Sequence, residues 1–429
     1  MNYRISISPL LLFFCLFFIN FFSEAQVKNK VPIIHPSFFR SNEQQFKRLL
    51  RHKLPQWENV LDSATNYRLQ IYLAQIDEKE NGNLKISYYQ YPSKVDYYTY
   101  PASIIKLPMA FLFLLKLEEI NLQQSIKAIS LDDRLFIDDS TYCGQLGTNG
   151  IQNGMRIGSL LQELLQKSNN TAFNPLYDVV RDYKGNQELD FMEAIIQQRF
   201  SYKCDSSTNQ TFAAYHIEDA AGNIKYAEAS APKQPTRRLS KEFATAGKAY
   251  LDNKDSLITS PKSFERLNYV SIENAHQLLV RFVTSENVGD FFSRTFRDSL
   301  LYYMRALPPK DTANEIYPST FKYLYYGSDV SDRKKPLTAS QSSNQEAFHL
   351  YNKVGQAYGF LSDVAYFESL DHHTKYVLAA SIFVDRDGVL NDGKYAYDEI
   401  GFPFMADLGK LIFQSEFKRT HKRKYLKSL

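Results

Sequence analysis

The hydrophobic positions of the chain fall first into a helical pattern and then into a pair of strands. Between residues 42 and 62, apolar side chains recur every three or four positions among charged ones, which predicts an amphipathic helix. Residues 68–76 and 84–91 are short apolar stretches typical of strands. The polar segment between them, residues 78–83, contains an Asn-Gly pair, so the two strands are predicted to form a β-hairpin.

Helical patterns dominate the middle of the chain. Leu107 to Ile120 is apolar on nearly every side, which indicates a buried helix rather than a surface one. Further helical patterns cover residues 155–167, 171–181, 189–199 and 272–284. Residues 202–258 and 308–348 are polar and mixed, and we interpret them as irregular or inserted segments.

The C-terminal part returns to strand patterns. Three strand-like runs, residues 352–355, 364–368 and 377–384, precede a helical pattern over residues 404–417. Strands at both ends of the chain, with helices between them, predict an α+β fold. In this fold one sheet is built from the two chain ends and a helical lobe is inserted between them.

The N-terminus has the order of a secretory signal peptide. Arg4 precedes an apolar run over residues 10–22, and Ser23-Glu24-Ala25 supplies a small-x-small cleavage site. We therefore predict a signal peptide over residues 1–25, a leader and helix over residues 26–66, and a secreted or periplasmic protein. An uncleaved anchor is the alternative, and it would also place the remaining chain outside the membrane.

Composition narrows the range of partners. The 429 residues are 44% hydrophobic and 23% charged, with a formal net charge of +4, which is ordinary globular composition and does not favour nucleic acid. The basic residues at 418–424 are interpreted as part of a solvated tail over residues 418–429, with a membrane or polyanion contact as the alternative. No stable protein partner and no cofactor are expected.

Cysteine usage leaves one question open. Removal of a signal peptide would take Cys15 with it and leave Cys143 and Cys204. In an exported protein these two could pair, or they could remain as free buried thiols. Neither has a histidine nearby at metal-ligand spacing, so no metal site is predicted.

Ser103 and Lys106 form an S-x-x-K tetrad that can carry nucleophilic chemistry. A serine hydroxyl is a weak nucleophile and needs a base within hydrogen-bonding reach. On a helix, residues three apart share a face, so the Lys106 amine can reach the Ser103 oxygen. Burial lowers a lysine pKa and makes the neutral amine available as that base. The tetrad is short and recurs in this chain at Ser230/Lys233, Ser319/Lys322, Ser331/Lys334 and Ser415/Lys418. Only Ser103 opens a long apolar helix, and this context selects it.

Two further motifs bear polar side chains suited to a substrate. Ser168-Asn169-Asn170 lies between two helical patterns, where a hydroxyl could relay a proton and the Asn170 amide could hold a substrate amide. A plain helix cap is the alternative for that motif. Lys353-Val354-Gly355 lies on a predicted strand, where the lysine could bind a carboxylate and the glycine admits close approach of a substrate backbone. A strand that merely carries a lysine is the alternative.

Together, the motifs S-x-x-K, S-x-N and K-x-G resemble those of the active-site serine penicillin-recognising superfamily, and class A β-lactamases in particular. The stretches SNNTAFN (168–174) and KVGQAYG (353–359) extend the resemblance. It implies a β-lactamase/transpeptidase-like domain over residues 67–417, with insertions near 205–260 and 308–348. Its antiparallel sheet would come from the two chain ends, packed with helices and accompanied by an all-helical lobe.

The resemblance also implies residue roles. Ser103 would be the acylated nucleophile, Lys106 its base, and Ser168 a group that assists proton transfer. Asn170 would bind the substrate amide, and Lys353 would anchor a carboxylate. The backbone N–H groups of Ser103 and Gln356 would form the oxyanion hole, with Gly355 beside them on the substrate strand.

The chain departs from the class A pattern in two places. No E-x-x-L-N string, which in that class supplies the deacylating base, occurs between Phe200 and Ser271. Val354 replaces a hydroxyl residue of the third motif. We therefore expect a hydrolase that opens a β-lactam or related amide, with two alternatives: a penicillin-binding protein or D-Ala-D-Ala peptidase that deacylates slowly, and a non-catalytic binding domain. The expected ligand is a small β-lactam or a peptidoglycan peptide.

Overall fold

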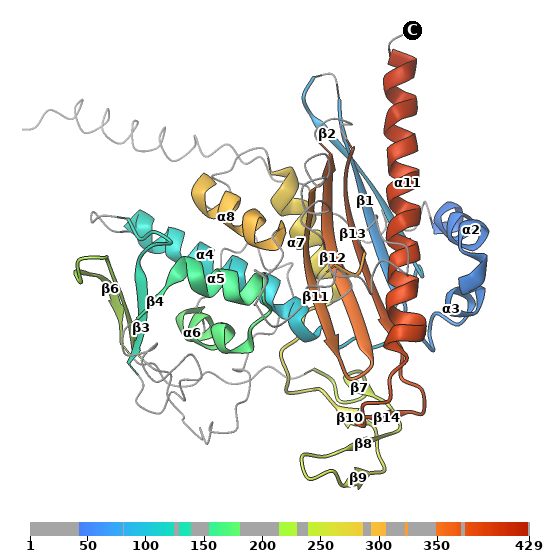
Figure 1. The fold of residues 1–429 in the computed structure, drawn as a ribbon, viewed down its shortest axis with the longest axis horizontal. Coiled ribbons are helices and arrows are strands. Elements are labelled where there is room, and N and C mark those ends of the chain that lie inside the picture. Colours follow the sequence, from blue (N-terminus) through green and yellow to red (C-terminus); the bar gives the residue numbers. More distant parts are fainter. Residues whose placement is uncertain are drawn as a thin grey trace, which may run out of the picture. The chain divides into compact units, whose positions relative to one another are not determined.

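The fold is built on a five-stranded sheet. The computed structural model describes residues 43–79, 81–123, 128–138, 154–180, 214–229, 239–285, 293–305, 322–324, 349–369 and 374–427. Residues from Ser37 onward form one unit. The sheet contains β1 (Gln70–Glu78), β2 (Leu84–Tyr91), β11 (His349–Ala357), β12 (Phe360–Ser369) and β13 (Thr374–Phe383) in the order β11-β12-β13-β1-β2, with every neighbouring pair antiparallel (Figure 1). The predicted hairpin and the sheet made from both chain ends are confirmed.

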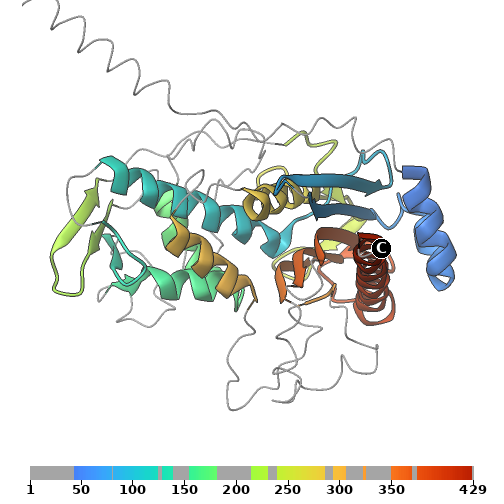
Figure 2. The same cartoon turned by 90° about the horizontal axis from the view of Figure 1, so that it is seen from above.

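Helices cover both faces of this sheet. On one face lie α2 (Glu43–Lys53), α3 (Glu58–Asp62) and α11 (Phe402–Lys427), and on the other lies α7 (Ile272–Thr284) (Figures 1 and 2). Alternation along β1 follows from the two-residue strand period: Ile71 and Leu73 join the core beneath α2 and α11, whereas the Tyr72 ring lies 6.0 Å from the His276 ring of α7. Because both faces are covered, β12 and β13 are buried at nearly every position.

The helix expected over residues 42–62 is interrupted. It consists of α2, a 3-10 turn over Pro55–Trp57, and α3. Pro55 has no N–H group and sterically disfavours helical geometry at the preceding residue, and Leu54 accordingly has φ −124° and ψ 53°. Both helices still pack against the sheet through buried apolar side chains, so this predicted leader helix belongs to the same unit as the sheet.

The helical part carries α4 (Lys106–Gln123), α5 (Ile157–Leu165), α6 (Asn170–Val180) and α8 (Arg294–Arg305). It also holds a small sheet in the order β4 (Met155–Arg156), β3 (Arg134–Asp138), β5 (Ala214–Glu218) and β6 (Ile224–Glu228). The predicted α+β fold is confirmed, but the lobe is not purely helical. The polar segment 202–258, expected to be irregular, contributes β5 and β6, since Tyr215 and Ile217 alternate as buried positions with half-buried ones.

Several predictions concern residues that the structure does not describe. The predicted helix over residues 189–199 lies outside the described residues, as does the segment 308–348 apart from residues 322–324. Cys143 and Cys204 also lie outside them, so their pairing stays an open prediction.

The last helix reaches further than the sequence pattern indicated. α11 continues to Lys427, so most of the predicted basic tail is helical. The Arg419 guanidinium donates to Asp77 of β1 and to Glu416, each at 2.6 Å, and its side chain is largely covered. This basic residue is therefore docked on the sheet rather than solvated. Among the described helices, none combines the length and apolar character needed to cross a bilayer.

We predict that His276 makes the fold acid-sensitive. Its side chain is buried, its Nε2 lies 3.2 Å from the Val377 carbonyl oxygen, and burial lowers its pKa to about 4. The folded protein therefore keeps the His276 ring neutral, whereas the unfolded chain protonates it below pH 6.5. The stability that the neutral ring contributes is lost as pH falls from 6.5 towards 4. Between pH 7.5 and pH 5 the free energy of unfolding should fall by about 2 kcal/mol through this group. Urea unfolding of wild type and His276→Gln at both pH values measures the difference, and an unchanged pH dependence in the variant would contradict it.

Candidate active site

The nucleophile turn joins a 3-10 segment to the buried helix α4. Ala102–Ile105 form the 3-10 turn η3, and Lys106 begins α4. In a 3-10 turn side chains three apart are eclipsed, so Ser103 and Lys106 point the same way. The residue before the serine, Ala102, has φ +46°, a left-handed conformation that is costly for alanine and that occurs mostly at functional turns. This turn presents Ser103 partly exposed above a fully buried lysine.

The Lys106 amine is placed to accept the Ser103 proton. Its Nζ lies 3.0 Å from Ser103 Oγ and 2.6 Å from Asn170 Oδ1, and it also contacts the Ser168 carbonyl oxygen. Two of these partners are carbonyl oxygens that only accept hydrogen bonds, and they match the two N–H bonds of a neutral amine. The amine lone pair can then face the Ser103 hydroxyl, which can donate. The geometry therefore suits Lys106 as a base.

Ser168 links the two lysines of the site. Lys353 Nζ donates to Ser168 Oγ at 2.9 Å, and Lys106 Nζ lies 3.3 Å from the same oxygen. Ser168 lies two residues before α6 and has φ +57°, a left-handed conformation in the turn between α5 and α6. Ser103, Lys106, Ser168 and Lys353 thus form one continuous polar chain from three segments that are remote in sequence, as the motifs predicted.

Burial sets the charge of these lysines. Burial, and after it the nearby charge of Lys353, lower the pKa of Lys106 to about 6. Burial also lowers the pKa of Lys353 to about 7, while the Asp363 carboxylate opposes that shift. The two ammonium groups repel each other through one shared hydroxyl, so the pair favours a neutral Lys106 beside a charged Lys353.

Gly355 lets the strand β11 contact the nucleophile turn. A Cβ at this position would lie 2.4 Å from the Pro101 carbonyl oxygen and 3.2 Å from the Ile104 nitrogen. Only glycine therefore permits this approach of β11 to η3. Gln356 follows on the strand, and with Ser103 it lines the same cavity, where their backbone N–H groups were predicted to form the oxyanion hole.

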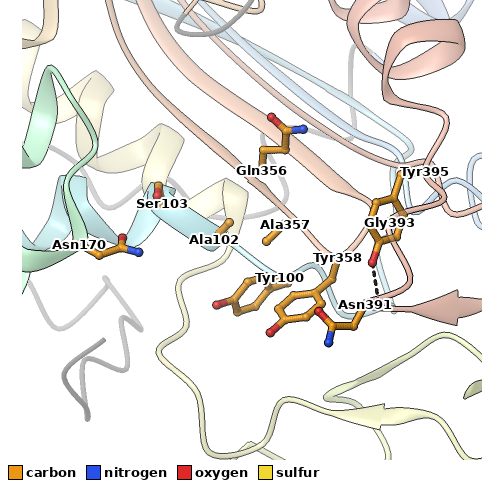
Figure 3. A pocket seen from close by; sticks show the side chains of 10 residues that line it. All are labelled: Tyr100, Ala102, Ser103, Asn170, Gln356, Ala357, Tyr358, Asn391, Gly393 and Tyr395. Atoms are coloured by element: carbon orange, nitrogen blue, oxygen red, sulfur yellow. Dashed lines mark hydrogen bonds between the residues drawn. The ribbon is translucent and has the colours of Figure 1, made fainter. Parts of the chain in front are cut away.

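A cavity of about 490 Å³ opens beside Ser103 (Figure 3). It is lined by Tyr100, Ala102, Ser103, Asn170, Gln356, Ala357, Tyr358, Asn391, Gly393 and Tyr395. Asn170 lies next to Ser103, and its Oδ1 is taken by Lys106, so its Nδ2 is the group suited to a substrate carbonyl. Sequence reasoning missed Tyr100 and residues 391–395, because they carry no motif, and it gave no role to Tyr358, which belongs to the KVGQAYG stretch.

A buried polar network behind Lys353 was also missed. Lys322 Nζ donates to Asn352 Oδ1 at 3.0 Å, and Asn352 Nδ2 donates to Asp363 Oδ1 at 2.9 Å. Asp363 Oδ2 accepts from the Leu324 N–H at 3.1 Å. Lys322 belongs to a rival S-x-x-K tetrad, and its amine is buried behind β11 rather than beside a nucleophile. The available sequence signal was an asparagine and an aspartate, Asn352 and Asp363, at strand positions whose neighbours are largely apolar.

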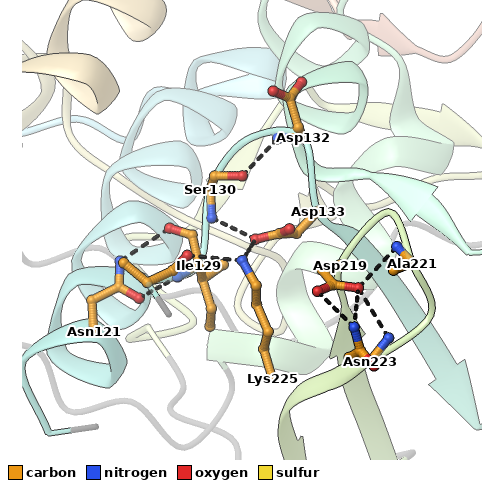
Figure 4. Close-up of polar contacts among 10 residues, drawn as sticks. Asn121, Ile129, Ser130, Asp132, Asp133, Asp219, Ala221, Asn223 and Lys225 are labelled. Carbon is orange, nitrogen blue, oxygen red and sulfur yellow. Dashed lines mark hydrogen bonds and ion pairs between the residues drawn. The ribbon is translucent and has the colours of Figure 1, made fainter. Parts of the chain in front are cut away.

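Acidic residues between Phe200 and Ser271, where the class A pattern would have its glutamate, are engaged in other contacts. Glu228 accepts hydrogen bonds from Tyr215 and Tyr226, and Asp219 accepts from Ala221 and Asn223 within its own turn (Figure 4). Glu218 contacts His216, Glu242 contacts Ser240, and Asp205 lies outside the described residues. In the part of the chain that the structure describes, no carboxylate lines the cavity of Ser103.

The same hairpin is fastened to the lobe by a buried ion pair. Lys225 on β6 donates to Asp133 at 2.6 Å and to the Ala128 carbonyl oxygen at 2.8 Å, with both charged side chains almost fully covered (Figure 4). The contacts of Lys225 thus hold the β5–β6 hairpin against the rest of the lobe. Among the described residues no cluster of three or more His, Cys, Asp or Glu side chains could hold a metal ion.

Comparison with known proteins agrees with the motifs. A model of the β-lactamase enzyme family matches residues 55–201, which include Ser103, Lys106, Ser168 and Asn170 but not Lys353. The predicted resemblance to serine penicillin-recognising proteins is thereby confirmed. A search of curated proteins returned no significant match.

Several solved structures are similar to the chain. PBP-A is 15% identical, with 85% of this chain and 96% of that chain covered and a TM-score of 0.44. A class A β-lactamase from Bacteroides cellulosilyticus is 12% identical, with 85% and 97% covered and a TM-score of 0.44. A mutant of the class A β-lactamase of the last common ancestor of Gram-negative bacteria is 16% identical, with 84% and 97% covered and a TM-score of 0.42. Such scores carry no weight for the fold, which rests on the sheet order described above.

We predict that Gly355→Ala disables the site more than it destabilises the chain. The added methyl would meet the Pro101 carbonyl oxygen and push β11 away from the nucleophile turn. A displacement of about 1 Å at a reacting centre can cost a factor of about 100 in rate. The rate of serine acylation should fall by at least tenfold. Gly82→Ala, which adds the same methyl in open space in the β1–β2 turn, is the control, and an equal effect of both variants on acylation would contradict the prediction.

Proposed function

We propose that this β-lactamase-like serine protein is an exported hydrolase that opens a β-lactam or related amide through an acyl-serine intermediate. The observation that carries the proposal is the convergence of Ser103, Lys106, Ser168 and Lys353 within hydrogen-bonding distance of one another. Export is proposed from the charge and hydrophobic order of residues 1–25.

In the proposed first step, the neutral Lys106 amine takes the proton of the Ser103 hydroxyl. The serine oxygen attacks the substrate carbonyl carbon, and the negative charge develops on the carbonyl oxygen near the Ser103 and Gln356 N–H groups. The amide C–N bond then breaks. Its nitrogen receives a proton through Ser168, whose hydroxyl is in reach of both lysines, and the acyl group stays on Ser103 as an ester. Lys353, charged and buried, is placed to bind a carboxylate of the leaving part.

The second step, attack of water on the ester, needs a base that returns Ser103 and releases the acid. A general base contributes a factor of about 10²–10⁴ in rate. Because the sequence lacks an E-x-x-L-N string, the second candidate is a penicillin-binding protein or D-Ala-D-Ala peptidase that forms the same acyl-serine and releases it slowly. Both candidates share the first step, and they differ in the lifetime of the ester.

Mass spectrometry after exposure to benzylpenicillin and to a chromogenic cephalosporin tests this proposal. We expect a covalent adduct on Ser103 in wild type and none in Ser103→Ala, while Ser319→Ala, the rival tetrad, behaves as wild type. A long-lived adduct supports the penicillin-binding candidate, and fast release of hydrolysed cephalosporin supports the β-lactamase. Neither adduct nor turnover would contradict both and leave a binding domain on the same fold.

The pH dependence of acylation provides a separate prediction. Lys106 must be neutral to act as the base, so the acylation rate should rise as pH increases through about 6. Lys353 must be charged to bind a carboxylate, so the rate should decline as pH increases beyond about 7. The Lys106→Arg variant keeps a cation that does not lose its proton, so it should lower the acylation rate by a factor of about 10²–10⁴. It should also abolish the acid limb of the profile, which is the rise of the rate with pH through about 6. Stopped-flow rates from pH 5 to pH 9 measure both limbs, and a flat profile in wild type would refute the assignment.

A further inference from the structure

Lys322 is a buried cation that the proposed mechanism does not use. Its side chain is almost fully covered, and its Nζ donates to the Leu350 carbonyl oxygen at 3.2 Å and to Asn352 Oδ1 at 3.0 Å. Both partners lie on β11, the strand that carries Lys353. Neither partner is negatively charged, and a buried ammonium group is costly without an opposite charge. That charge must therefore come from a group further away.

The Asp363 carboxylate supplies negative charge to two lysines. Asn352 joins Lys322 to it, because its Oδ1 accepts from Lys322 while its Nδ2 donates to Asp363 Oδ1 at 2.9 Å. Burial lowers the pKa of Lys322 to about 8, and the Asp363 charge opposes this shift. The same charge opposes the lowering of the Lys353 pKa. One buried carboxylate thus serves two buried ammonium groups and cannot fully compensate both.

The two lysines also line one small cavity. Lys322 and Lys353 border a space of about 10 Å³ together with Asn352 and residues of α8. Such a space admits about one water molecule. Because it excludes bulk water, the charges around it interact with little screening. A change in the charge of Lys322 is therefore felt in the surroundings of Lys353.

The segment that carries this lysine, residues 322–324, is fixed between β12 and α11. The Leu324 N–H donates to Asp363 Oδ2 at 3.1 Å. A Cβ at Gly409 of α11 would lie 2.3 Å from the Leu324 carbonyl oxygen, so the helix lies directly against the segment. The Tyr323 ring also packs against the start of α11. These contacts hold the segment at a constant position relative to the carboxylate.

Further charges reach this network from neighbouring elements. Arg305 at the end of α8 acts on Lys322 in the same direction as burial and lowers its pKa. Lys106 of α4 faces Lys353 across the Ser168 hydroxyl, and the two amines repel each other when both are protonated. Three titratable groups nearby stay neutral at pH 7, since burial raises the pKa of the tyrosines and lowers that of the histidine: Tyr303, Tyr323 and His349.

We propose that Lys322 is a positioning residue that acts through Asp363. By taking part of the charge of this carboxylate, Lys322 limits the charge that Lys353 retains, and it thereby confines acylation to a narrow range of pH. Lys322 comes from the second polar insertion, so the inserted chain would tune the site without contacting substrate. The proposal rests on the proposed function, in which a charged Lys353 binds a carboxylate.

The sharing of one carboxylate fixes the direction of each expected change. When Lys322 loses its charge, Asp363 is left to Lys353 alone, and the pKa of Lys353 should rise from about 7 towards about 8. Lys353 then stays protonated to higher pH, so the alkaline decline of the acylation rate should move to higher pH. Loss of the Asp363 charge should have the opposite effect. A residue that only fills space would not give two shifts of opposite sign.

NMR of the full-length chain tests the charge of Lys353 without requiring chemistry. Lysine labelled with ¹³C at Cε reports its own protonation, and the Lys353→Arg variant identifies the Lys353 signal. We expect the pKa of Lys353 to rise by about 1 in Lys322→Gln and to fall in Asp363→Asn. Lys375→Gln, which removes a partly exposed cation paired with Glu368, is the matched control and should leave that pKa unchanged.

The pH profile of acylation by benzylpenicillin provides the second measurement. In Lys322→Gln the alkaline decline should lie about 1 pH unit above that of wild type, while the rise near pH 6 moves little. Lys322→Met, which fills a similar volume without charge, should give the same shift even if the glutamine variant folds poorly. Lys322→Arg keeps the charge and should restore the decline of wild type.

The outcomes separate this proposal from the proposed function. An unchanged pKa of Lys353 in the uncharged Lys322 variants, or shifts of the same sign in Lys322→Gln and Asp363→Asn, would overturn the role of Lys322. Benzylpenicillin would still acylate wild-type Ser103 in that case if the proposed function is correct. Absence of this adduct from wild type, together with the expected pKa shifts, would instead overturn the function and leave the sharing of charge in place.

Discussion

Two buried lysines that face one hydroxyl set the chemistry of this protein. Lys106 and Lys353 both contact Ser168 Oγ, and both have lost most of their water. In such surroundings the free energy of keeping both amines protonated is high, because two ammonium groups so close together repel each other. One amine therefore loses its proton more readily. The amine next to Ser103 has the lower pKa. The lowered pKa of the amine beside Ser103 is thus a consequence first of burial and then of the second like charge packed next to it.

The sheet makes this crowding possible. β11 carries Lys353, and Gly355 two residues later lets the strand lie against the turn that holds Ser103. Behind the strand, Asp363 on β12 supplies the negative charge that keeps the Lys353 pKa from falling further, and Asn352 and the Leu324 N–H hold Asp363 in place. Burial of these groups is tolerated because they form one connected hydrogen-bonded network.

The segments that interrupt the domain contribute to the site rather than only decorating it. Lys322, from the second polar insertion, donates to the network behind Lys353. β8 (Ala249–Leu251) of the first insertion pairs with β14 (Val389–Leu390), and Phe264, just beyond that insertion, packs against two of the tyrosines that line the cavity. Ser103 and Lys106 come from η3 and α4, whereas the far wall of the cavity comes from residues 391–395.

Sequence alone determined the sheet strands, the buried helix and the order of the three motifs, because two-residue and 3.6-residue periods and an apolar helix after Ser103 are local signals. It could not place the break at Pro55 within one continuous apolar pattern, nor the β5–β6 hairpin, whose alternation is short and polar. Tertiary structure alone decided that Lys322 lies behind Lys353 and that Asn391 and Tyr395 close the cavity. These residues are brought to the site by contacts between segments far apart in the chain, and such contacts leave no periodic trace in the sequence.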